Sequence, residues 1–339
     1  MSTLYVTEPG ARIEKENKRI LVTKEGTVLL SIPIFKVSEI VLIGSAGLTT
    51  PAMLALLDNG IHVNLLSRSG SLRGKLISMH SSNIPLLKVQ FIRSEDAGFK
   101  LTLSKAFVNG KLHNCRVMAL RMRRNENLSA EFQSKMDLAL GQLSQCLERA
   151  ANCENIGLLR GYEGLGTRAY FSIFRLALNP VERLKFENRQ RRPPRDPLNS
   201  MLSFGYSLLA NSLASACEIA GLDANLGFFH TAGNCKPALA LDLMEEFRPI
   251  IVDSIVLRAV NEKRLQEKDF FIGEGGKCLF TRHGLRIFLL MYSKRIQQHI
   301  VSPLNGIKYS YQRAFEEQVR QIRSILEGNK STYQSFRVR

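Results

Sequence analysis

Short runs of aliphatic and β-branched residues, separated by turn residues, fill the first eighty positions of the chain. These runs predict strands over Thr3–Thr7, Arg19–Thr23, Thr27–Ile32, Ile40–Ile43, His62–Leu66 and Leu72–Met79. Lys24-Glu25-Gly26, between two of the runs, suits a short hairpin loop. Residues 1–80 are therefore predicted as a β-rich N-terminal domain.

One helix interrupts this series of strands. It is predicted over Ala52–Asn59, with Thr50 as its N-cap. Pro51 is suited to the first helical position, and Gly60 stands just past the end, where a glycine commonly terminates a helix.

Beyond residue 80 the apolar positions recur at the spacing of a helix instead of a strand. The segment Ser81-Ser82-Asn83-Ile84-Pro85 opens this part, and residues 81–90 are predicted as a linker. Helices are then predicted over Leu101–Val108, Cys115–Arg124, Ala130–Ala151, Ile156–Leu178, Pro197–Ala220, Pro237–Phe247, Pro249–Val260, Arg282–Ile300 and Ser310–Glu327. The predicted fold class is α+β, with an all-α domain over residues 91–330 and a C-terminal tail over residues 331–339.

The positive charge of the chain is concentrated in the helical part. The chain carries 47 Lys and Arg against 30 Asp and Glu, a net charge of +17. Residues 1–80 hold 9 basic and 6 acidic side chains, and the remaining residues hold 38 and 24. Because 45% of the residues are hydrophobic, a packed globular protein is expected, and its basic excess favours a polyanionic partner. Nucleic acid is the first such partner to consider.

Other features narrow the compartment. The N-terminal MSTLYVTEPG has neither a basic start nor an apolar core, so we expect no secretory signal. The uncharged stretch Ile40–Leu57 is broken by Gly44-Ser45 and Pro51, which argues against a membrane span. A membrane-surface role would need a basic amphipathic helix with aromatic anchors, which the sequence lacks. The six cysteines form no C-x-x-C pair and are expected to be buried thiols of a cytoplasmic protein.

Basic residues gather in two segments of the helical part. The first holds Arg116, Arg121, Arg123 and Arg124, and the second, around Pro193-Pro194, holds Arg183, Lys185, Arg189, Arg191, Arg192 and Arg195. Arginines in a proline-stiffened loop can meet phosphates at little ordering cost. A solvated charged face explains either segment alone, but the two together favour nucleic acid.

A glycine-rich stretch, Arg160–Phe171, lies inside an otherwise apolar predicted helix. Gly161, Gly164 and Gly166 each cost a helix interior roughly 1 kcal/mol relative to alanine. We therefore expect another backbone or a ligand to lie close by. Glu163 stands among these glycines, and a carboxylate in such a helix is either exposed or paired with a cation.

A second segment places a histidine before an acidic helix. His230 ends a short apolar run, and Asp242, Glu245 and Glu246 follow on one helical face. Together with Glu163, these side chains could meet at one cation, and oxygen-rich ligation suits Mg²⁺ or Mn²⁺ better than Zn²⁺. Taken singly, His230 is as well explained as a structural histidine and the acidic face as a solvated one. The spacing does not decide which acid is a ligand.

A third segment, Arg191–Ala210, joins the basic loop to a helix. Asp196 is the expected N-cap and Pro197 the first helical residue. Arginines before a helix N-terminus suit a phosphate anchor. Asn199 is a candidate to support the site, or else a capping or core amide.

The order of these segments resembles one protein family. RGYEGLGTRAYF, RRPPRDPLNSMLSFGYSLL and GLDANLGFFHTAGNCKPALALDLMEEFRP follow one another as in the CRISPR-associated integrase and endonuclease family, the first-numbered Cas protein. The N-terminal IHVNLLSRSGSLRGKLISM fits it as well, so the resemblance covers nearly the whole chain. It implies an α-helical catalytic domain and a homodimer formed largely through β-rich N-terminal domains. Two such dimers would flank a dimer of the small second-numbered Cas protein.

The resemblance also assigns roles to single residues. The family's metal-binding positions fall on Glu163, His230 and Glu245, and an acidic position that supports the site in some members falls on Asp242. The implied ion is Mg²⁺ or Mn²⁺. Gly166-Thr167 departs from the alanine-like residues of many members, which bears on helix packing and not on the ligands.

The activity that the resemblance implies is a DNA endonuclease and integrase of spacer acquisition. The 3′-hydroxyl of a short captured duplex would attack a phosphodiester of the CRISPR array. The arginines expected to hold the double-stranded DNA are Arg121, Arg123, Arg124, Arg189, Arg191, Arg192 and Arg195. The competing interpretation is a non-catalytic nucleic-acid-binding scaffold of a defence complex, whose acidic residues are structural.

Overall fold

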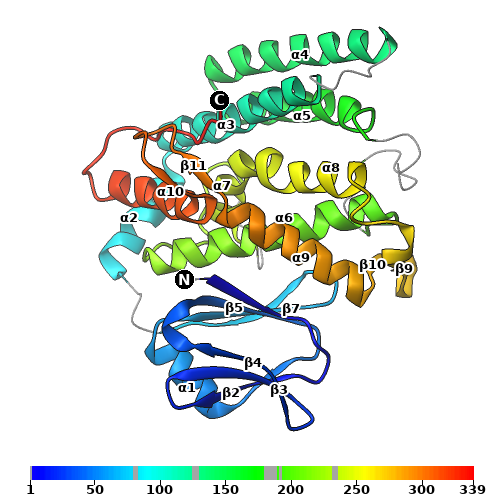
Figure 1. Cartoon of the computed structure of the whole chain (residues 1–339). Coiled ribbons are helices and arrows are strands. Elements are labelled where there is room, and N and C mark those ends of the chain that lie inside the picture. Colours follow the sequence, from blue (N-terminus) through cyan, green and yellow to red (C-terminus); the bar gives the residue numbers. More distant parts are fainter. Residues whose placement is uncertain (1, 79–82, 124–129, 179–188, 191–192, 231–235) are drawn as a thin grey trace.

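The computed structural model describes residues 2–78, 83–123, 130–178, 189–190, 193–230 and 236–339. A strand-rich N-terminal part lies against a larger helical part (Figure 1). The α+β fold class predicted from the sequence is therefore confirmed. Within the described ranges, none of the helices has the length and apolar character that a membrane crossing needs.

Two four-stranded sheets form the N-terminal part. The first contains, in spatial order, β1 Ser2–Val6, β5 Val37–Ile43, β7 His62–Leu66 and β8 Leu72–Leu76, with only the last pair antiparallel. The second contains β4 Thr27–Pro33, β3 Arg19–Lys24, β2 Arg12–Glu16 and β6 Gly47–Leu48. Strand β2 was not predicted, because its RIEKE segment places a single apolar side chain, Ile13, in the core.

Helix α1, Thr50–Asp58, packs Leu56 into the core of this part. Its N-cap is Thr49, which has extended backbone angles, so the predicted cap at Thr50 was wrong by one residue. Gly60 follows the helix with a φ of 65°, a conformation that glycine adopts at little cost.

The helical part is longer and less purely helical than predicted. Its α-helices are α2 Ile84–Glu95, α3 Ala97–Arg123, α4 Ala130–Ala151, α5 Ile156–Phe174, α6 Pro197–Ile219, α7 Ala238–Arg248, α8 Ser254–Asn261, α9 Arg282–Gln297 and α10 Tyr311–Leu326. Two hairpins are added by β9 Phe270–Ile272 with β10 Cys278–Phe280, and β11 His299–Val301 with β12 Lys308–Ser310. Short 3-10 turns cover Ile34–Lys36, Glu267–Asp269 and Glu274–Gly276.

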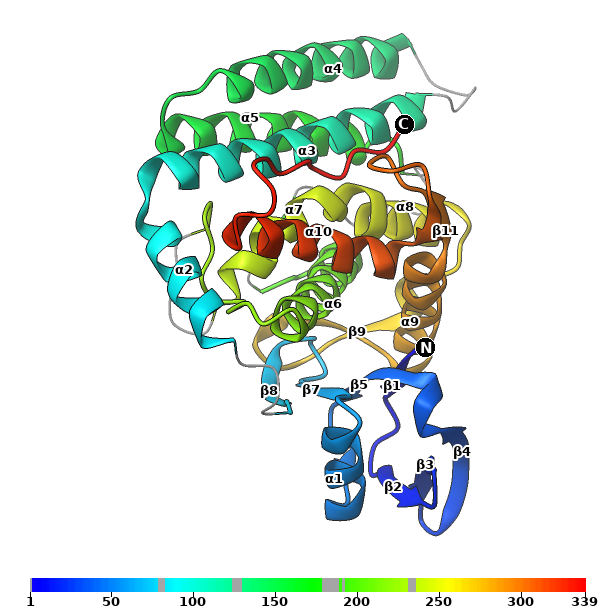
Figure 2. The same cartoon turned by 90° about the vertical axis from the view of Figure 1, so that its left-hand side faces the viewer.

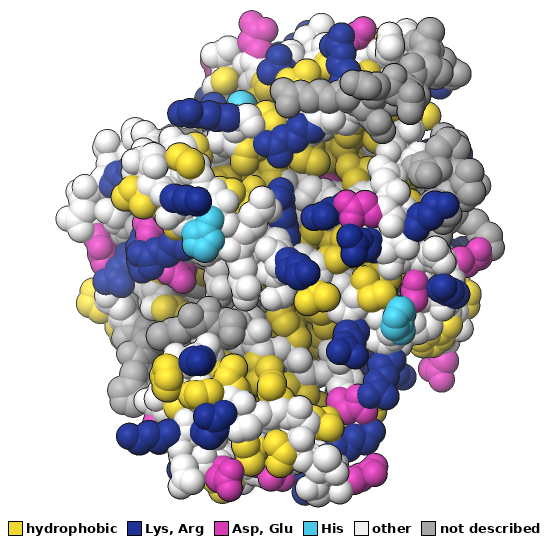
Figure 3. Space-filling view, in the orientation of Figure 1, with side chains coloured by type: hydrophobic (Ala, Val, Ile, Leu, Met, Phe, Trp, Pro, Cys, Tyr) yellow, Lys and Arg dark blue, Asp and Glu magenta, His cyan; other side chains and the backbone are white. Residues whose placement is uncertain are grey.

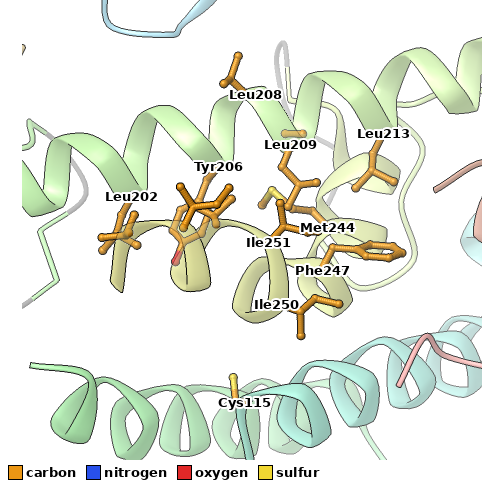
Figure 4. Packing of buried hydrophobic residues seen from close by; sticks show 14 of the residues in the cluster. Cys115, Leu202, Tyr206, Leu208, Leu209, Leu213, Met244, Phe247, Ile250 and Ile251 are labelled. Atoms are coloured by element: carbon orange, nitrogen blue, oxygen red, sulfur yellow. The ribbon is translucent and has the colours of Figure 1, made fainter. Parts of the chain in front are cut away.

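The helices are stacked in layers above the sheets. Helices α3, α4 and α5 form the layer farthest from the strands, and α6 to α9 lie between that layer and the sheets (Figures 1 and 2). Helix α7 continues directly into a π-helix over Pro249–Asp253 and then into α8. Leu209 of α6 packs with Phe247 and Ile251 of this continuous element (Figure 4). The layer α3–α5 thereby faces α7 across a common apolar core.

The predicted linker at residues 81–90 is wrong from Ile84 onward, because α2 begins there. Gln90 of this helix is buried and donates hydrogen bonds to the carbonyl oxygens of Asp223 and Leu226, at 2.8 and 3.0 Å. Because these two carbonyl oxygens satisfy the Gln90 amide in the interior, a segment of mixed polar and apolar residues can form a packed helix.

The two helices predicted over Leu101–Val108 and Cys115–Arg124 are one helix, α3, up to Arg123, and Arg124 lies outside the described residues. Residues 109–114 lay between the two predicted ranges. In the structure, however, Lys111 and Asn114 are buried and contact other elements.

The predicted C-terminal tail, residues 331–339, packs as a strap across α3, α7 and α10. Phe336 is completely buried, and its ring centroid lies 5.0 Å from that of Phe247. Asn114 of α3 donates to the Phe336 carbonyl oxygen at 2.8 Å and accepts from the Val338 N–H at 3.0 Å. The strap is therefore part of the core.

The cysteines fit the expectation of buried thiols. Cys115, Cys146, Cys153, Cys217 and Cys278 are buried and free, while Cys235 lies outside the described residues. Burial raises the pKa of Cys278 to about 11, which disfavours a reactive thiolate.

Candidate active site

Glu163 lies in the middle of helix α5. The helix begins with Asn155, whose side chain accepts the N–H of Leu158 at 2.8 Å. The Glu163 side chain is 21% exposed, and its Oε1 accepts a hydrogen bond from Thr167 Oγ at 3.0 Å. The same oxygen pairs with the ammonium of Lys111 on α3. Thr167, one turn after the glutamate, therefore helps to fix the carboxylate.

The three glycines of α5 have different surroundings. A Cβ at Gly166 would lie 2.4 Å from Leu112 Cδ2, so this glycine allows α3 and α5 to approach closely. Added Cβ atoms at Gly161 and Gly164 would meet no described atom within 4 Å. At Gly166 the close neighbours are side chains and not the expected backbone or ligand, and at the other two glycines no described atom lies close.

Asp242 on α7 organises the loop that precedes the helix. It is fully buried, and its Oδ2 accepts the backbone N–H groups of Phe228 and Phe229 at 2.6 and 3.0 Å. A Cβ at Gly227 would lie 2.9 Å from Asp242 Oδ2 and 2.7 Å from the Ala238 backbone, so only glycine fits there. The loop is thereby wrapped tightly around one carboxylate.

The same carboxylate fixes His230. Its Oδ1 accepts the His230 backbone N–H at 2.8 Å and lies 2.7 Å from the ring Nδ1. The Nδ1–Asp242 bond leaves Nε2 as the nitrogen available to a ligand, and no described residue bonds to it. Burial opposes protonation of His230, but the hydrogen bond and the charge of Asp242 outweigh it, so the pKa is raised.

Glu245 faces the layer that contains Glu163. It is buried, its Oε1 accepts a hydrogen bond from Arg248 at 2.7 Å, and its Oε2 lies 2.6 Å from Lys111 Nζ. Burial would raise the pKa of Glu245, but the charges of Arg248, Lys111 and His230 outweigh it and hold the pKa far below the ordinary value.

Lys111 therefore joins two of the predicted ligands. Its side chain is only 3% exposed, and its ammonium pairs with Glu163 Oε1 and Glu245 Oε2. Burial lowers the pKa of Lys111, but the two carboxylates more than compensate, and the net direction is upward. Lys111 was not predicted as a site residue, because it lies in the polar stretch between two predicted helices and its partners are distant in sequence.

Glu246 points away from this cluster. Its Oε2 accepts hydrogen bonds from the Phe336 N–H at 2.7 Å and from Gln318 Nε2 at 2.9 Å. Burial raises the pKa of Glu246 to about 8. The three acids thus have different surroundings: Asp242 holds the histidine loop, Glu245 shares Lys111 with Glu163, and Glu246 anchors the C-terminal strap.

Behind Glu245 lies a buried chain of polar groups. The Arg248 guanidinium stacks over the ring of Tyr206 on α6, 4.2 Å from its centroid, and the Tyr206 hydroxyl donates to Asp253. Burial raises the pKa of Asp253 to about 6. This chain ties the carboxylate face of α7 rigidly to α6.

Asn199 and Arg189 hold the start of α6. Asn199 is fully buried, receives the Arg189 guanidinium on its Oδ1 at 2.9 Å, and donates from its side-chain amide to Asp196 at 2.6 Å. The Arg189 guanidinium also lies over Tyr206, 5.5 Å from its centroid. Asn199 thus holds residues 189–190 and the N-cap Asp196 against the start of α6, and its support of the site stays a prediction.

The other predicted DNA-binding arginines are scattered in their surroundings. Arg195 and Arg121 are exposed, and Arg121 donates to the carbonyl oxygen of Arg339 at 3.0 Å. Arg123 pairs with Asp137 at 3.1 Å. Arg124, Arg191 and Arg192 lie outside the described residues. Their contacts with DNA stay predictions.

One further residue of the site escaped the sequence analysis. Arg160 on α5 donates to the carbonyl oxygen of Phe229 at 2.9 Å and stacks over its ring, 5.8 Å from the centroid. It links the helix of Glu163 to the loop of His230.

The residues present suit a hard divalent ion in their chemistry. Within the described ranges, no three His, Cys, Asp or Glu side chains are close enough together to hold a metal. However, Glu163 and Glu245 already face one cation, the Lys111 ammonium, and His230 offers a free Nε2. Two carboxylates and one imidazole match the ligand preference of Mg²⁺ or Mn²⁺. The three ligand roles stay predictions.

Sequence comparison finds a family and close relatives. The family model described as CRISPR associated protein Cas1 matches residues 4–294. CRISPR-associated endonuclease Cas1 3 of Thermus thermophilus is 35% identical over 342 residues, covering 100% of this chain and 98% of that protein. A CRISPR-associated exonuclease Cas4/endonuclease Cas1 fusion of Rhodospirillum rubrum is 33% identical over 338 residues, 98% of this chain. The chain spans 57% of that fusion and 60% of a similar one from Geobacter sulfurreducens.

Solved structures share the fold along the whole chain. A CAS1 protein from Thermotoga maritima has a TM-score of 0.79 at 20% identity, covering 100% of both chains. A casposase bound to an integration product has a TM-score of 0.83 at 22% identity, with 98% and 93% coverage. A Cas6-RT-Cas1–Cas2 complex contains a chain that matches with a TM-score of 0.83 at 22% identity. The match covers 99% of the present chain and 36% of that longer chain.

Proposed function

The chain belongs to the Cas1 family of CRISPR-associated proteins, and we propose that it is a metal-dependent DNA endonuclease and integrase of spacer acquisition. It would join the 3′-hydroxyl of a short DNA duplex to a phosphodiester of the CRISPR array. One observation carries the proposal: Glu163 of α5 and Glu245 of α7 share one cation, while Asp242 holds Nδ1 of His230 and leaves Nε2 without a bond to any described residue.

The residues divide into ligands and positioning groups. Glu163, Glu245 and Nε2 of His230 would hold Mg²⁺ or Mn²⁺, which when bound supplies a Lewis acid for the scissile phosphate. Asp242 keeps the imidazole in one tautomer and one orientation. Because a metal-bound imidazole is a poor base, we assign His230 to ligation and not to proton transfer.

The surface around the site suits a nucleic-acid backbone. Figure 3 shows Lys and Arg side chains over one face of the molecule, on the helical part and also on the strand-rich part. Added Cβ atoms at Gly161 and Gly164 meet no described atom within 4 Å, so a DNA backbone can approach α5 closely at these glycines. Contacts of this kind give salt-sensitive affinity with little base reading. The casposase that shares the fold is bound to an integration product, which supports the same use here.

The N-terminal part offers a surface for a homodimer. Strand β4 is an edge strand, paired within the described chain only with β3. Its side chains at Val28, Leu29 and Leu30 are 52%, 51% and 42% exposed, and the adjacent Phe35 is 67% exposed. An exposed apolar edge of this kind is a template for pairing with another strand. We assign this edge to dimerisation. We also propose that the dimer binds Cas2, the protein found in one complex that contains this fold.

The test is a strand-transfer assay in Mn²⁺ with the purified chain, alone and together with Cas2. It measures the joining of a duplex with free 3′ ends to a supercoiled plasmid that carries a repeat. Glu163→Gln, Glu245→Gln and His230→Ala should each lower the rate at least a hundredfold, whereas the exposed Glu274→Gln should leave it unchanged. Unchanged rates in the three site variants would reject the proposal. DNA binding without any strand transfer by the unaltered chain would favour the scaffold instead.

A further inference from the structure

The Lys111 ammonium stands where two predicted ligands meet. It pairs with Glu163 Oε1 from α5 and lies 2.6 Å from Glu245 Oε2 on α7. Both oxygens would be needed by a divalent ion held between these helices. The lysine and the ion therefore compete for the same two acceptors.

The packing of α3 holds the lysine in this position. A Cβ at the preceding Gly110 would lie 2.8 Å from Ser335 Cβ and 3.0 Å from Glu246 Cγ, so the helix backbone presses against α7 and the C-terminal strap. The following Leu112 fills the gap that Gly166 leaves on α5. With both neighbours clamped, the Lys111 Cα cannot retreat, and only the flexible side chain can move.

The cluster already holds two buried cations without a metal. Lys111 and Arg248 supply two positive charges, and Glu163, Glu245 and Asp242 supply three negative ones when the His230 ring is neutral. A divalent ion that binds the neutral ring would change the net charge of the cluster from −1 to +1 beside these two cations. Its binding is therefore penalised until an anion compensates, and the substrate phosphate is the anion that enters this site.

We propose that Lys111 is a built-in competitor of the divalent ion that makes metal and DNA bind cooperatively. Without DNA, its ammonium bridges Glu163 and Glu245 and weakens metal binding. When a DNA phosphate enters beside Glu163, the ammonium turns to the phosphate and releases both carboxylates to the ion. The inference rests on the proposed function, since it assumes that Glu163 and Glu245 are the ligands.

The experiment measures Mn²⁺ binding to the full chain by the loss of the free-ion EPR signal, with and without a branched DNA of the integration-product type. Lys111→Met keeps the length and removes the charge, and should tighten Mn²⁺ binding at least tenfold without DNA. Lys111→Arg should stay as weak as the unaltered chain. Lys105→Met, on the same helix and outside the cluster, is the matched control and should change nothing.

The unaltered chain provides a second measurement that needs no variant at Lys111. The branched DNA should tighten Mn²⁺ binding at least fivefold, and Mn²⁺ should tighten DNA binding by the same factor, because the coupling is reciprocal. A methylphosphonate at the junction, which removes the phosphate charge, should abolish this coupling.

The outcomes separate this inference from the proposed function. Equal Mn²⁺ affinities for the unaltered chain and Lys111→Met, with binding lost in Glu163→Gln and Glu245→Gln, would overturn the role of the lysine and keep the metal site. Coupling that survives the methylphosphonate would overturn it as well. Mn²⁺ binding that none of these variants alters would overturn both.

Discussion

Asp242 Oδ1 accepts two hydrogen bonds from a single residue, His230, one from the backbone N–H at 2.8 Å and one from the ring Nδ1 at 2.7 Å. Its other oxygen accepts the N–H groups of Phe228 and Phe229. Every acceptor direction of this buried carboxylate is thus used within the loop that carries the imidazole. Asp242 is a positioning residue, although it lies only one turn from a predicted ligand.

Asp242→Asn should weaken metal binding without removing a ligand. An amide at this position can accept through one oxygen only, so its NH₂ group would face a backbone N–H, and the His230 ring would lose its fixed tautomer. We expect a 10- to 100-fold loss of Mn²⁺ affinity, the usual effect of removing such a partner of a ligating histidine. EPR titration measures the affinity, and ¹⁵N NMR of the imidazole reports the tautomer.

The matched control for this variant is Asp137→Asn, an exposed aspartate on α4 that pairs with Arg123. It should leave both readouts unchanged. An unaltered tautomer together with unaltered Mn²⁺ affinity in Asp242→Asn would contradict the positioning role.

The raised pKa of His230 predicts opposite pH trends for the metal-free fold and for metal binding. The protonated ring pairs with Asp242, which stabilises the metal-free fold below the ordinary histidine pKa of about 6.5. This contribution is lost as the pH rises through the higher folded pKa. A metal binds only the neutral ring, so metal affinity grows over the same rise.

The increase in Tm on adding Mn²⁺ should therefore grow between about pH 6 and about pH 8. Differential scanning calorimetry at several pH values, in buffers of equal ionic strength, measures it. In His230→Ala the increase should be small and nearly independent of pH. A pH profile of the unaltered chain that matches this variant would show that the imidazole is not a ligand.

Sequence patterns predicted those parts of the fold that depend on local periodicity. Strands such as β7 and helices such as α6 follow from runs whose apolar spacing matches their burial. Strand β2 escaped because a half-exposed strand of five residues needs only Ile13 in the core. The predicted break in α3 was wrong because Lys111 and Asn114 are satisfied by partners far away in the chain.

The candidate site also contains residues that a local sequence pattern predicts and residues that it does not. Glu163, His230 and the acidic face of α7 stood out locally, as polar groups in apolar surroundings. Which acid faces which partner depends on how α3, α5 and α7 pack, and no local pattern encodes that arrangement. Lys111 and Arg160 are long-range partners of this kind, since each gains its role only from an element distant in sequence.

Glu246 should make the stability of the protein fall as the pH rises. Burial raises its pKa to about 8, so the folded state holds a proton that the unfolded state releases near its ordinary pKa. The associated stability is present below the unfolded pKa and is lost as the pH rises through the folded one. Glu246→Gln cannot ionise, and its oxygen can still accept the Phe336 N–H and Gln318 bonds.

We therefore expect Glu246→Gln to be more stable than the unaltered chain at about pH 9, by roughly 2 kcal/mol, and nearly equal at about pH 5. Urea unfolding at the two pH values gives both differences. The exposed Glu274→Gln should show no such change. A difference that is the same at both pH values would mean that Glu246 is ionised in the folded protein.

Two glycines of α5, only two residues apart, should respond oppositely to alanine. At Gly166 the new Cβ would meet Leu112 Cδ2 at 2.4 Å, so α3 must shift, at a cost of about 1–3 kcal/mol. At Gly164 no described atom lies within 4 Å, and alanine should stabilise the helix by about 0.5–1 kcal/mol. Chemical denaturation of both variants checks the signs.

DNA binding separates the two glycines in a second way. If a phosphate backbone lies over Gly164, its alanine variant should bind a duplex more weakly despite its greater stability, because the methyl group keeps the DNA backbone away from α5. Fluorescence anisotropy at fixed salt measures this, with the exposed Gly141→Ala of α4 as control, since a Cβ there also meets no described atom within 4 Å. Equal DNA affinity for both variants and the unaltered chain would move the DNA path away from this face of α5, while leaving the packing argument at Gly166 intact.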